Sequence, residues 1–160
     1  MHKEFNLGKL VELNFVETIC NILEISEDKV LFATKEQDIN EHWDVSIIGN
    51  KIDVKGLKKI NRSDPEPNEE YHWVELVNVK GDKGWLYGDA DYFAFELTRC
   101  YIIVTKNDLQ DFIKYKCKDK KLMTDKKELY HLYRREGRKD IMTLVKSIDL
   151  VNISGDIIKK

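Results

Sequence analysis

The sequence has little cysteine and proline, and it has no long apolar run. Its three cysteines, Cys20, Cys100 and Cys117, lie far apart, with no CxxC pair and no histidine at ligand spacing. This pattern excludes a disulfide framework and a zinc module, and it is typical of a reducing cytoplasm. No apolar run approaches the ~18 residues of a transmembrane helix, and residues 1–6 lack the apolar region of a secretory signal. We therefore expect a cytoplasmic protein that is not inserted in a membrane.

Several catalytic signatures are also missing. The sequence contains neither GxGxxG nor a Walker A motif, which removes the usual signatures of nucleotide binding. No HNH or HxxxH spacing is present, so we do not expect a nuclease that binds its metal through histidines. No GxSxG motif or Cys–His pairing indicates a covalent hydrolase. Any chemistry must therefore reside in other side chains.

What the chain does have is charge, and this charge is unevenly distributed. Of its 160 residues 35% are charged and 42% are hydrophobic, which is enough apolar material for the core of one domain. Residues 1–105 carry 12 basic and 20 acidic side chains, whereas residues 106–160 carry 15 and 9. This asymmetry is compatible with a metal-dependent enzyme that acts on a polyanion, or with a solvated basic surface. We expect one domain over 1–160, with a core over 1–117 and a basic C-terminal extension over 118–160.

The apolar pattern predicts a mixed α/β (α+β) fold, with a central mixed sheet flanked by helices. Helical spacing indicates a helix over 8–23, and Asn107 and Asp108 resemble the N-cap of a helix that ends near 117. Residues 92–97 fit either a helix or a strand. The remaining expectations are strands at 30–33, 71–79, 85–87, 100–105 and 141–153, a short helix at 127–135, a charged linker at 118–127 and a loop at 61–70.

The most informative stretch is 44–55, where Gly49 and Asn50 between two alternating runs predict a two-residue hairpin turn. With this turn Asp44 faces Lys55. Opposed residues share a face of the sheet, so Asp44, Asp53 and Lys55 project together. The opposite, core-directed face carries the four apolar side chains Val45, Ile47, Ile52 and Val54. Two carboxylates and a lysine therefore converge.

Two convergent carboxylates repel each other and require a counter-charge. Mg²⁺ supplies it, because this ion takes oxygen ligands and keeps several waters, and Mn²⁺ can substitute for it. A bound metal lowers the pKa of water and stabilises the charge that builds up on a phosphate. A neighbouring lysine can orient or deprotonate the attacking water and offset phosphate charge. The combination of Asp44, Asp53 and Lys55 therefore fits hydrolysis of a phosphodiester.

Asp44 followed by Asp53-Val54-Lys55, across a hairpin after an N-terminal helix, resembles the PD-(D/E)xK nuclease superfamily, also called restriction-endonuclease-like. The resemblance covers roughly 8–117 and its motif is short, with Trp43 in place of the family's variable proline. It implies metal ligation by Asp44 and Asp53, and water activation or phosphate contact by Lys55. It also implies a Mg²⁺-dependent endonuclease that hydrolyses DNA. The sequence does not choose between DNA and RNA, or between endonuclease and exonuclease action.

The same resemblance suggests three further acids. Glu75 lies on the next expected strand, where family members often place an additional acid or glutamine near the site, so it is a candidate catalytic residue, although it also fits a solvated strand carboxylate. Glu17 and Glu12 lie on the first helix, where some members, notably archaeal Holliday-junction resolvases, place a metal-binding glutamate. Most helix glutamates are surface residues, so both alternatives stay open. We include Glu17 as a candidate metal ligand.

The stretch 84–92 resembles a segment of phage and prophage nucleases, in which case the protein would act in the host-cell cytoplasm. Its aromatic side chains Trp85, Tyr87 and Tyr92 fit either core packing or stacking on bases. The densest basic cluster is a candidate for phosphate binding, or a solvated turn, and consists of Arg134, Arg135, Arg138 and Lys139. The small size favours structure-directed cutting, or a homodimer that reads a short site.

Two other interpretations of the hairpin residues remain. One is a non-catalytic module that binds nucleic acid or protein on a nuclease-like fold. The other is a purely structural cross-strand ion pair between Lys55 and Asp44, which at an exposed position would contribute only ~0.2–1 kcal/mol.

Overall fold

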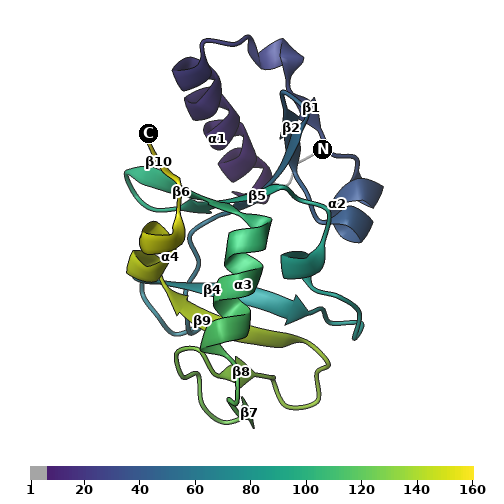
Figure 1. Ribbon diagram of the computed structural model, residues 1–160, viewed down its shortest axis with the longest axis vertical. Coiled ribbons are helices and arrows are strands. Elements are labelled where there is room, and N and C mark those ends of the chain that lie inside the picture. Colours follow the sequence, from purple (N-terminus) through teal and green to yellow (C-terminus); the bar gives the residue numbers. More distant parts are fainter. Residues whose placement is uncertain (1–6) are drawn as a thin grey trace.

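The expected mixed α+β fold is present in the computed structural model, which describes residues 7–160 (Figure 1). Residues 1–6, where no secretory signal was expected, lie outside the described residues. No helix within 7–160 is long and apolar enough to cross a membrane. The elements are α1 (Leu7–Leu23), η1 (Glu27–Lys29), β1 (Leu31–Phe32), α2 (Lys35–Glu41), β2 (Val45–Ile47), β3 (Asn50–Lys55), β4 (Tyr71–Val77), η2 (Trp85–Tyr87), β5 (Tyr92–Glu96), β6 (Cys100–Thr105), α3 (Lys106–Lys116), β7 (Leu122–Met123), β8 (Leu132–Tyr133), β9 (Ile141–Lys146), α4 (Ser147–Ile153) and β10 (Asp156–Lys159).

The strands form two sheets. The central sheet has the order β1-β2-β3-β5-β6-β10, and the second sheet has the order β4-β9-β8-β7. In the central sheet β3 and β5 run parallel, and the other described neighbours are antiparallel. Parallel neighbours need a crossover connection, and here the chain builds β4 and η2 before it returns to β5. The strand that follows the hairpin in sequence therefore belongs to the second sheet.

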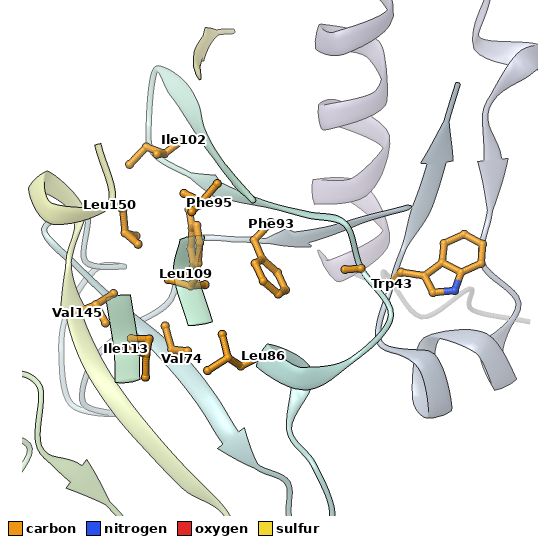
Figure 2. Packing of buried hydrophobic residues seen from close by; sticks show 12 residues of the cluster. Trp43, Val74, Leu86, Phe93, Phe95, Ile102, Leu109, Ile113, Val145 and Leu150 are labelled. Carbon is orange, nitrogen blue, oxygen red and sulfur yellow. The ribbon is translucent and has the colours of Figure 1, made fainter. Parts of the chain in front are cut away.

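Apolar side chains cover both faces of the central sheet. On one face α1 buries Phe15, Val16, Ile19 and Cys20, which are the residues that its helical spacing brings to one side. The other face meets α3, η2 and the second sheet. Figure 2 shows Phe93 and Phe95 of β5 directed toward Leu86, Leu109 and Val74.

This core determines where the charged hairpin residues lie. Asp53 is the register partner of Phe93, and Lys55 is the register partner of Phe95, in the parallel pair of β3 and β5. Register partners point to the same side of a sheet. Asp53 and Lys55 therefore face α3, η2 and the second sheet, whereas Val54 packs on the side of α1.

The hairpin turn lies one residue earlier than expected. Its central residues are Ile48 and Gly49, both with positive φ (51° and 77°), as in a type I′ turn. Ile47 therefore pairs with Asn50, and Val45 pairs with Ile52. This pairing differs from the expected one by two residues, which leaves every side chain on its expected face. The hydrophobic pattern could not distinguish the two registers, since both bury the same residues.

The segment after β4 was expected to contain a strand at 85–87 and instead contains the short helix η2. Two glycines, Gly84 and Gly88, allow this segment to pass very close to β4 and to the end of α2. A Cβ atom at Gly84 would lie 2.4 Å from the carbonyl oxygen of Glu75, and one at Gly88 would lie 2.7 Å from Cβ of His42. The chain is thus held too close to β4 and to the end of α2 for a flat strand.

The second half of the chain departs most from expectation, and residues 147–153, expected as part of a strand, form α4. Residues 92–97, which fitted either a helix or a strand, contain β5, and residues 127–135 contain β8 instead of a helix. The N-cap of α3 is Thr105, whose hydroxyl accepts from the amide of Asp108 at 3.1 Å, and not Asn107 or Asp108. The segment 118–160 is no appendage, because β9 pairs with β4, β10 pairs with β6, and Val145 and Leu150 are buried in the main core.

Candidate functional site

Asp44 and Asp53 come together at the base of the hairpin, and both are buried, with 9% and 4% of their surface exposed. Asp44 directly precedes β2, and its amide donates to the carbonyl of Ile52 at 2.9 Å. Its carboxylate accepts from the amide of Val54 at 2.7 Å. These two bonds hold the Asp44 side chain against β3, next to Asp53.

Lys55 completes the predicted group. Its Nζ lies 2.9 Å from Oδ2 of Asp53 and 4.3 Å from the ring centroid of Trp85. The contact with Asp53 has the distance of an ion pair, but Oδ2 has no partner with hydrogen-bond geometry among the described residues. The alternative of a structural ion pair between Lys55 and Asp44 is wrong, because the lysine pairs with Asp53 in its own strand.

The electrostatics of the site show a shortage of positive charge. Burial, opposed by the charge of Lys55 and joined by that of Asp44, raises the pKa of Asp53 to about 8. Burial, followed by the charge of Asp44, raises the pKa of Glu12 to about 7. The pKa of Asp38 in α2 is also raised, first by burial and then by Asp44. Glu12, Asp38 and Asp53, from three different elements, thus each interact with Asp44.

Of the two helix glutamates, the structure brings Glu12 to the site and not Glu17. Glu12 is near enough to Asp44 for the two carboxyls to interact, and it also lies 3.4 Å from Lys9. Glu17 follows five residues later, which at 3.6 residues per turn places it on a different side of α1. It is exposed, in a shallow groove with Asn14 and Lys160. The assignment of Glu17 as a metal ligand is therefore not supported by its position.

Asp38 was missed by sequence reasoning. It lies in α2, a short helix with no buried residue, which begins at a capping box between Thr34 and Gln37. That Thr-x-x-Gln spacing is a signal that could have indicated the helix. It would not have indicated that the helix folds back toward Asp44 and Lys55, because this depends on the tertiary arrangement.

The donor set suits a hard divalent cation that keeps much of its water. No three His, Cys, Asp or Glu side chains within 7–160 are close enough together, as they stand, to hold a metal ion by themselves. However, Asp44 and Asp53 are neighbouring buried acids, and Oδ2 of Asp53 lacks a hydrogen bond of good geometry among the described residues. Mg²⁺ is commonly bound through one or two carboxylates plus water. Asp44 and Asp53 fit this requirement.

Glu75 lies near the site but outside the carboxylate group. Its Oε1 accepts from the amide of Trp85 at 3.3 Å, across from β4 to η2. Glu75 and Lys55 line the same cavity, which has a volume of about 180 Å³. Trp85 therefore links the two residues, since its amide contacts Glu75 and its ring contacts Lys55. Trp85 also packs on Phe93, so its expected core role and a position at the site coexist.

The basic cluster lies in the connection between β8 and β9 of the second sheet. Arg135 is not a free phosphate ligand, because Nε and Nη2 donate to Oδ2 of the buried Asp140 at 3.2 and 2.8 Å. Arg138 and Lys139 are exposed and Arg134 is half-buried. The cluster thus divides into one structural arginine and three residues that can reach a ligand.

A comparison of the chain with protein-family models, with curated proteins and with solved structures found no match. Any assignment of function must therefore come from the side chains described above and their arrangement.

Proposed function

We propose that the protein is a divalent-metal-dependent nuclease of the PD-(D/E)xK type that hydrolyses phosphodiester bonds of DNA. The observation that carries the proposal is the placement of Asp44, Asp53 and Lys55. The three residues share one face of the hairpin, both acids are buried, and Lys55 lies 2.9 Å from Asp53. A purely structural sheet would more commonly place apolar side chains at such buried positions.

In this proposal Asp44 and Asp53 hold Mg²⁺ or Mn²⁺, and Glu12 supports them from α1. When bound, the ion would lower the pKa of water and stabilise the charge that develops on the phosphate. Lys55 presents its ammonium group beside the same carboxylates, where it can orient the attacking water or contact a phosphate oxygen. In the overall reaction water adds to phosphorus and loses a proton, and the departing sugar oxygen gains one.

The test compares cleavage of supercoiled plasmid, a four-way junction and single-stranded DNA and RNA oligonucleotides, each with Mg²⁺, Mn²⁺ or EDTA. We expect metal-dependent cutting that Asp53→Ala abolishes. Asp111→Asn, which changes an exposed acid in α3, is the matched control and should cut like wild type. Equal cutting by Asp53→Ala and wild type would overturn the assignment.

Calorimetry with Mn²⁺ adds a readout that does not depend on the substrate. A nuclease of this type should bind the ion, and Asp53→Ala should weaken binding strongly. If no substrate is cut and no metal binds, the alternative is a non-catalytic module that binds nucleic acid or protein.

A further inference from the structure

A cavity of about 180 Å³ opens beside Lys55, between the end of β3 and one side of β4. His72 and Val74 of β4 are buried toward the main core. Alternation along the strand directs Trp73 and Glu75 to the opposite side. Both of these side chains line the cavity, and His72 lines it as well. Because Lys55 contacts Asp53 and also lines the cavity, the cavity adjoins the proposed active site.

One wall of the cavity is aromatic and the other is cationic. Trp73 is partly exposed and packs on Tyr133, with ring centroids 5.7 Å apart. Lys58 lies on the wall that continues from Lys55. Although Lys58 as a whole is exposed, burial of its ammonium group and the charge of Lys55 lower its pKa. Two neighbouring ammonium groups that repel each other favour an anion between them.

Glu75 adds a hydrogen-bond acceptor to the cavity. One of its oxygens accepts from the amide of Trp85, and an ionised carboxylate has further acceptor positions. Amino and imino groups of nucleobases are donors that match these positions, and base stacking on an aromatic ring is the usual way to hold an unpaired base. The cavity thus offers a partner for the base and for the phosphate of a nucleotide.

We propose that this cavity holds one unpaired nucleotide of the substrate strand, next to the phosphate that is cut. The base lies against Trp73 and donates to Glu75, and its phosphate lies between Lys55 and Lys58. This inference rests on the proposed nuclease function and names its substrate class. A cavity of this size admits one base but not a base pair, so the substrate is single-stranded, or carries a flap, bulge or open end at the cleavage point.

The first experiment measures cleavage rates in Mg²⁺ on matched substrates. One is a continuous duplex, and the others have the same sequence with a flap or with one unpaired nucleotide, made with DNA or with RNA in the cut strand. We expect cutting at least tenfold faster where the strand is unpaired. The DNA and RNA arms show which nucleic acid the cavity accepts.

The second experiment measures binding of a fluorescent single-stranded oligonucleotide in EDTA, so that no cutting occurs. Lys58→Gln and Trp73→Leu should each weaken binding about tenfold, which is the size expected for one lost phosphate contact or one lost stacked base. Lys59→Gln removes an exposed charge outside the cavity and should leave binding unchanged. Thermal unfolding is measured for each variant. If Trp73→Leu does not fold, Lys58→Gln and Glu75→Gln carry the test.

Failure of the cavity proposal is distinct from failure of the proposed function. The cavity proposal would be overturned, and the nuclease proposal would stand, on two results together. The continuous duplex and the substrates with an unpaired nucleotide are cut at equal rates, and Lys58→Gln and Lys59→Gln bind the oligonucleotide with equal affinity. Absence of cutting, combined with binding that depends on Lys58 but not on Lys59, would overturn the nuclease and support the nucleotide site. Absence of both cutting and binding would overturn both.

Discussion

Lys55 Nζ lies 2.9 Å from Oδ2 of Asp53, yet that oxygen has no hydrogen bond of good geometry among the described residues. The ammonium group of Lys55 therefore lies close to the buried carboxyl group without a hydrogen bond of good geometry to this oxygen. An ammonium group has three N–H donors, so it can also serve another oxygen. In a hydrolytic site this is the useful arrangement, because the same ammonium group can turn toward water or phosphate.

Replacement of Asp53 by Asn is expected to abolish cutting and to stabilise the metal-free protein at alkaline pH. The pKa of Asp53 is raised from 3.8 to about 8 by burial, so the folded state retains a proton that the unfolded state has lost. Wild type therefore loses stability as the pH rises from about 4 to 8, whereas Asp53→Asn does not. At pH 8.5 we expect the variant to be more stable by on the order of 5 kcal/mol. Urea unfolding at pH 5 and pH 8.5 measures this difference, and a less stable variant at pH 8.5 would contradict it.

Glu12→Gln and Glu17→Gln form a matched pair on one helix. Glu12 interacts with Asp44, whereas Glu17 is exposed in a groove away from the site. We expect Glu12→Gln to weaken Mn²⁺ binding about tenfold or more, as loss of a supporting carboxylate does at other metal sites. Glu17→Gln should bind Mn²⁺ like wild type. Calorimetry measures the Mn²⁺ affinity of both variants. Equal affinities would show that Glu12 is not part of the site.

His72 makes the stability of the fold depend on pH in the opposite direction. Its side chain is buried, with the ring 5.2 Å from that of Phe95, and burial lowers its pKa from 6.5 to about 4. Between these values the unfolded chain binds a proton that the folded chain does not, so stability falls as the pH drops from 6.5 to 4. The loss from this one group amounts to about 3 kcal/mol. His72→Phe should remove that part of the acid sensitivity, measured by urea unfolding at pH 7.5, 5 and 4.2. The same change at the partly exposed His131 is the control, and identical pH profiles for all three proteins would refute the prediction.

The basic cluster should separate into a structural and a binding part. Arg135→Ala leaves the buried Asp140 without its ion pair, and we expect a loss of about 2 kcal/mol of stability, since the arginine itself is partly exposed. Arg138→Ala should change stability by less than about 0.5 kcal/mol. If this surface contacts DNA, Arg138→Ala should also reduce the salt dependence of binding. Denaturation of both variants, followed by DNA titrations at two salt concentrations, checks each part.

The fold and the candidate site were best predicted from the sequence where a local pattern of apolar residues repeats. The alternation of apolar residues in the hairpin determines which face Asp44, Asp53 and Lys55 share, and a register error of two residues leaves that face unchanged. The apolar spacing of 8–23 likewise predicted α1 almost to its ends. These features depend on contacts between residues that are close in sequence.

The features that the sequence did not predict depend on contacts between residues far apart in the chain. Tyr71 of β4 pairs with Lys146 of β9, so no pattern within 71–79 could show that this strand leaves the central sheet. The turn at Ile48 uses a β-branched residue with positive φ, which propensity argues against. Glu12 and Glu17 have similar local surroundings in sequence, and only the packing of α1 against the hairpin distinguishes them.

The crossover between β3 and β5 has a consequence for how the molecule assembles. The hairpin of β2 and β3 joins neighbouring residues and can form early, whereas the parallel pair closes only when the residues between Gly56 and Asp91 have found their places. Topologies with such distant pairings fold slowly, because chain entropy is lost before the contacts are gained. The acidic residues of the hairpin would therefore be present before Trp85 and Glu75 reach them. In this order of events the proposed site would be completed in one of the last steps of folding.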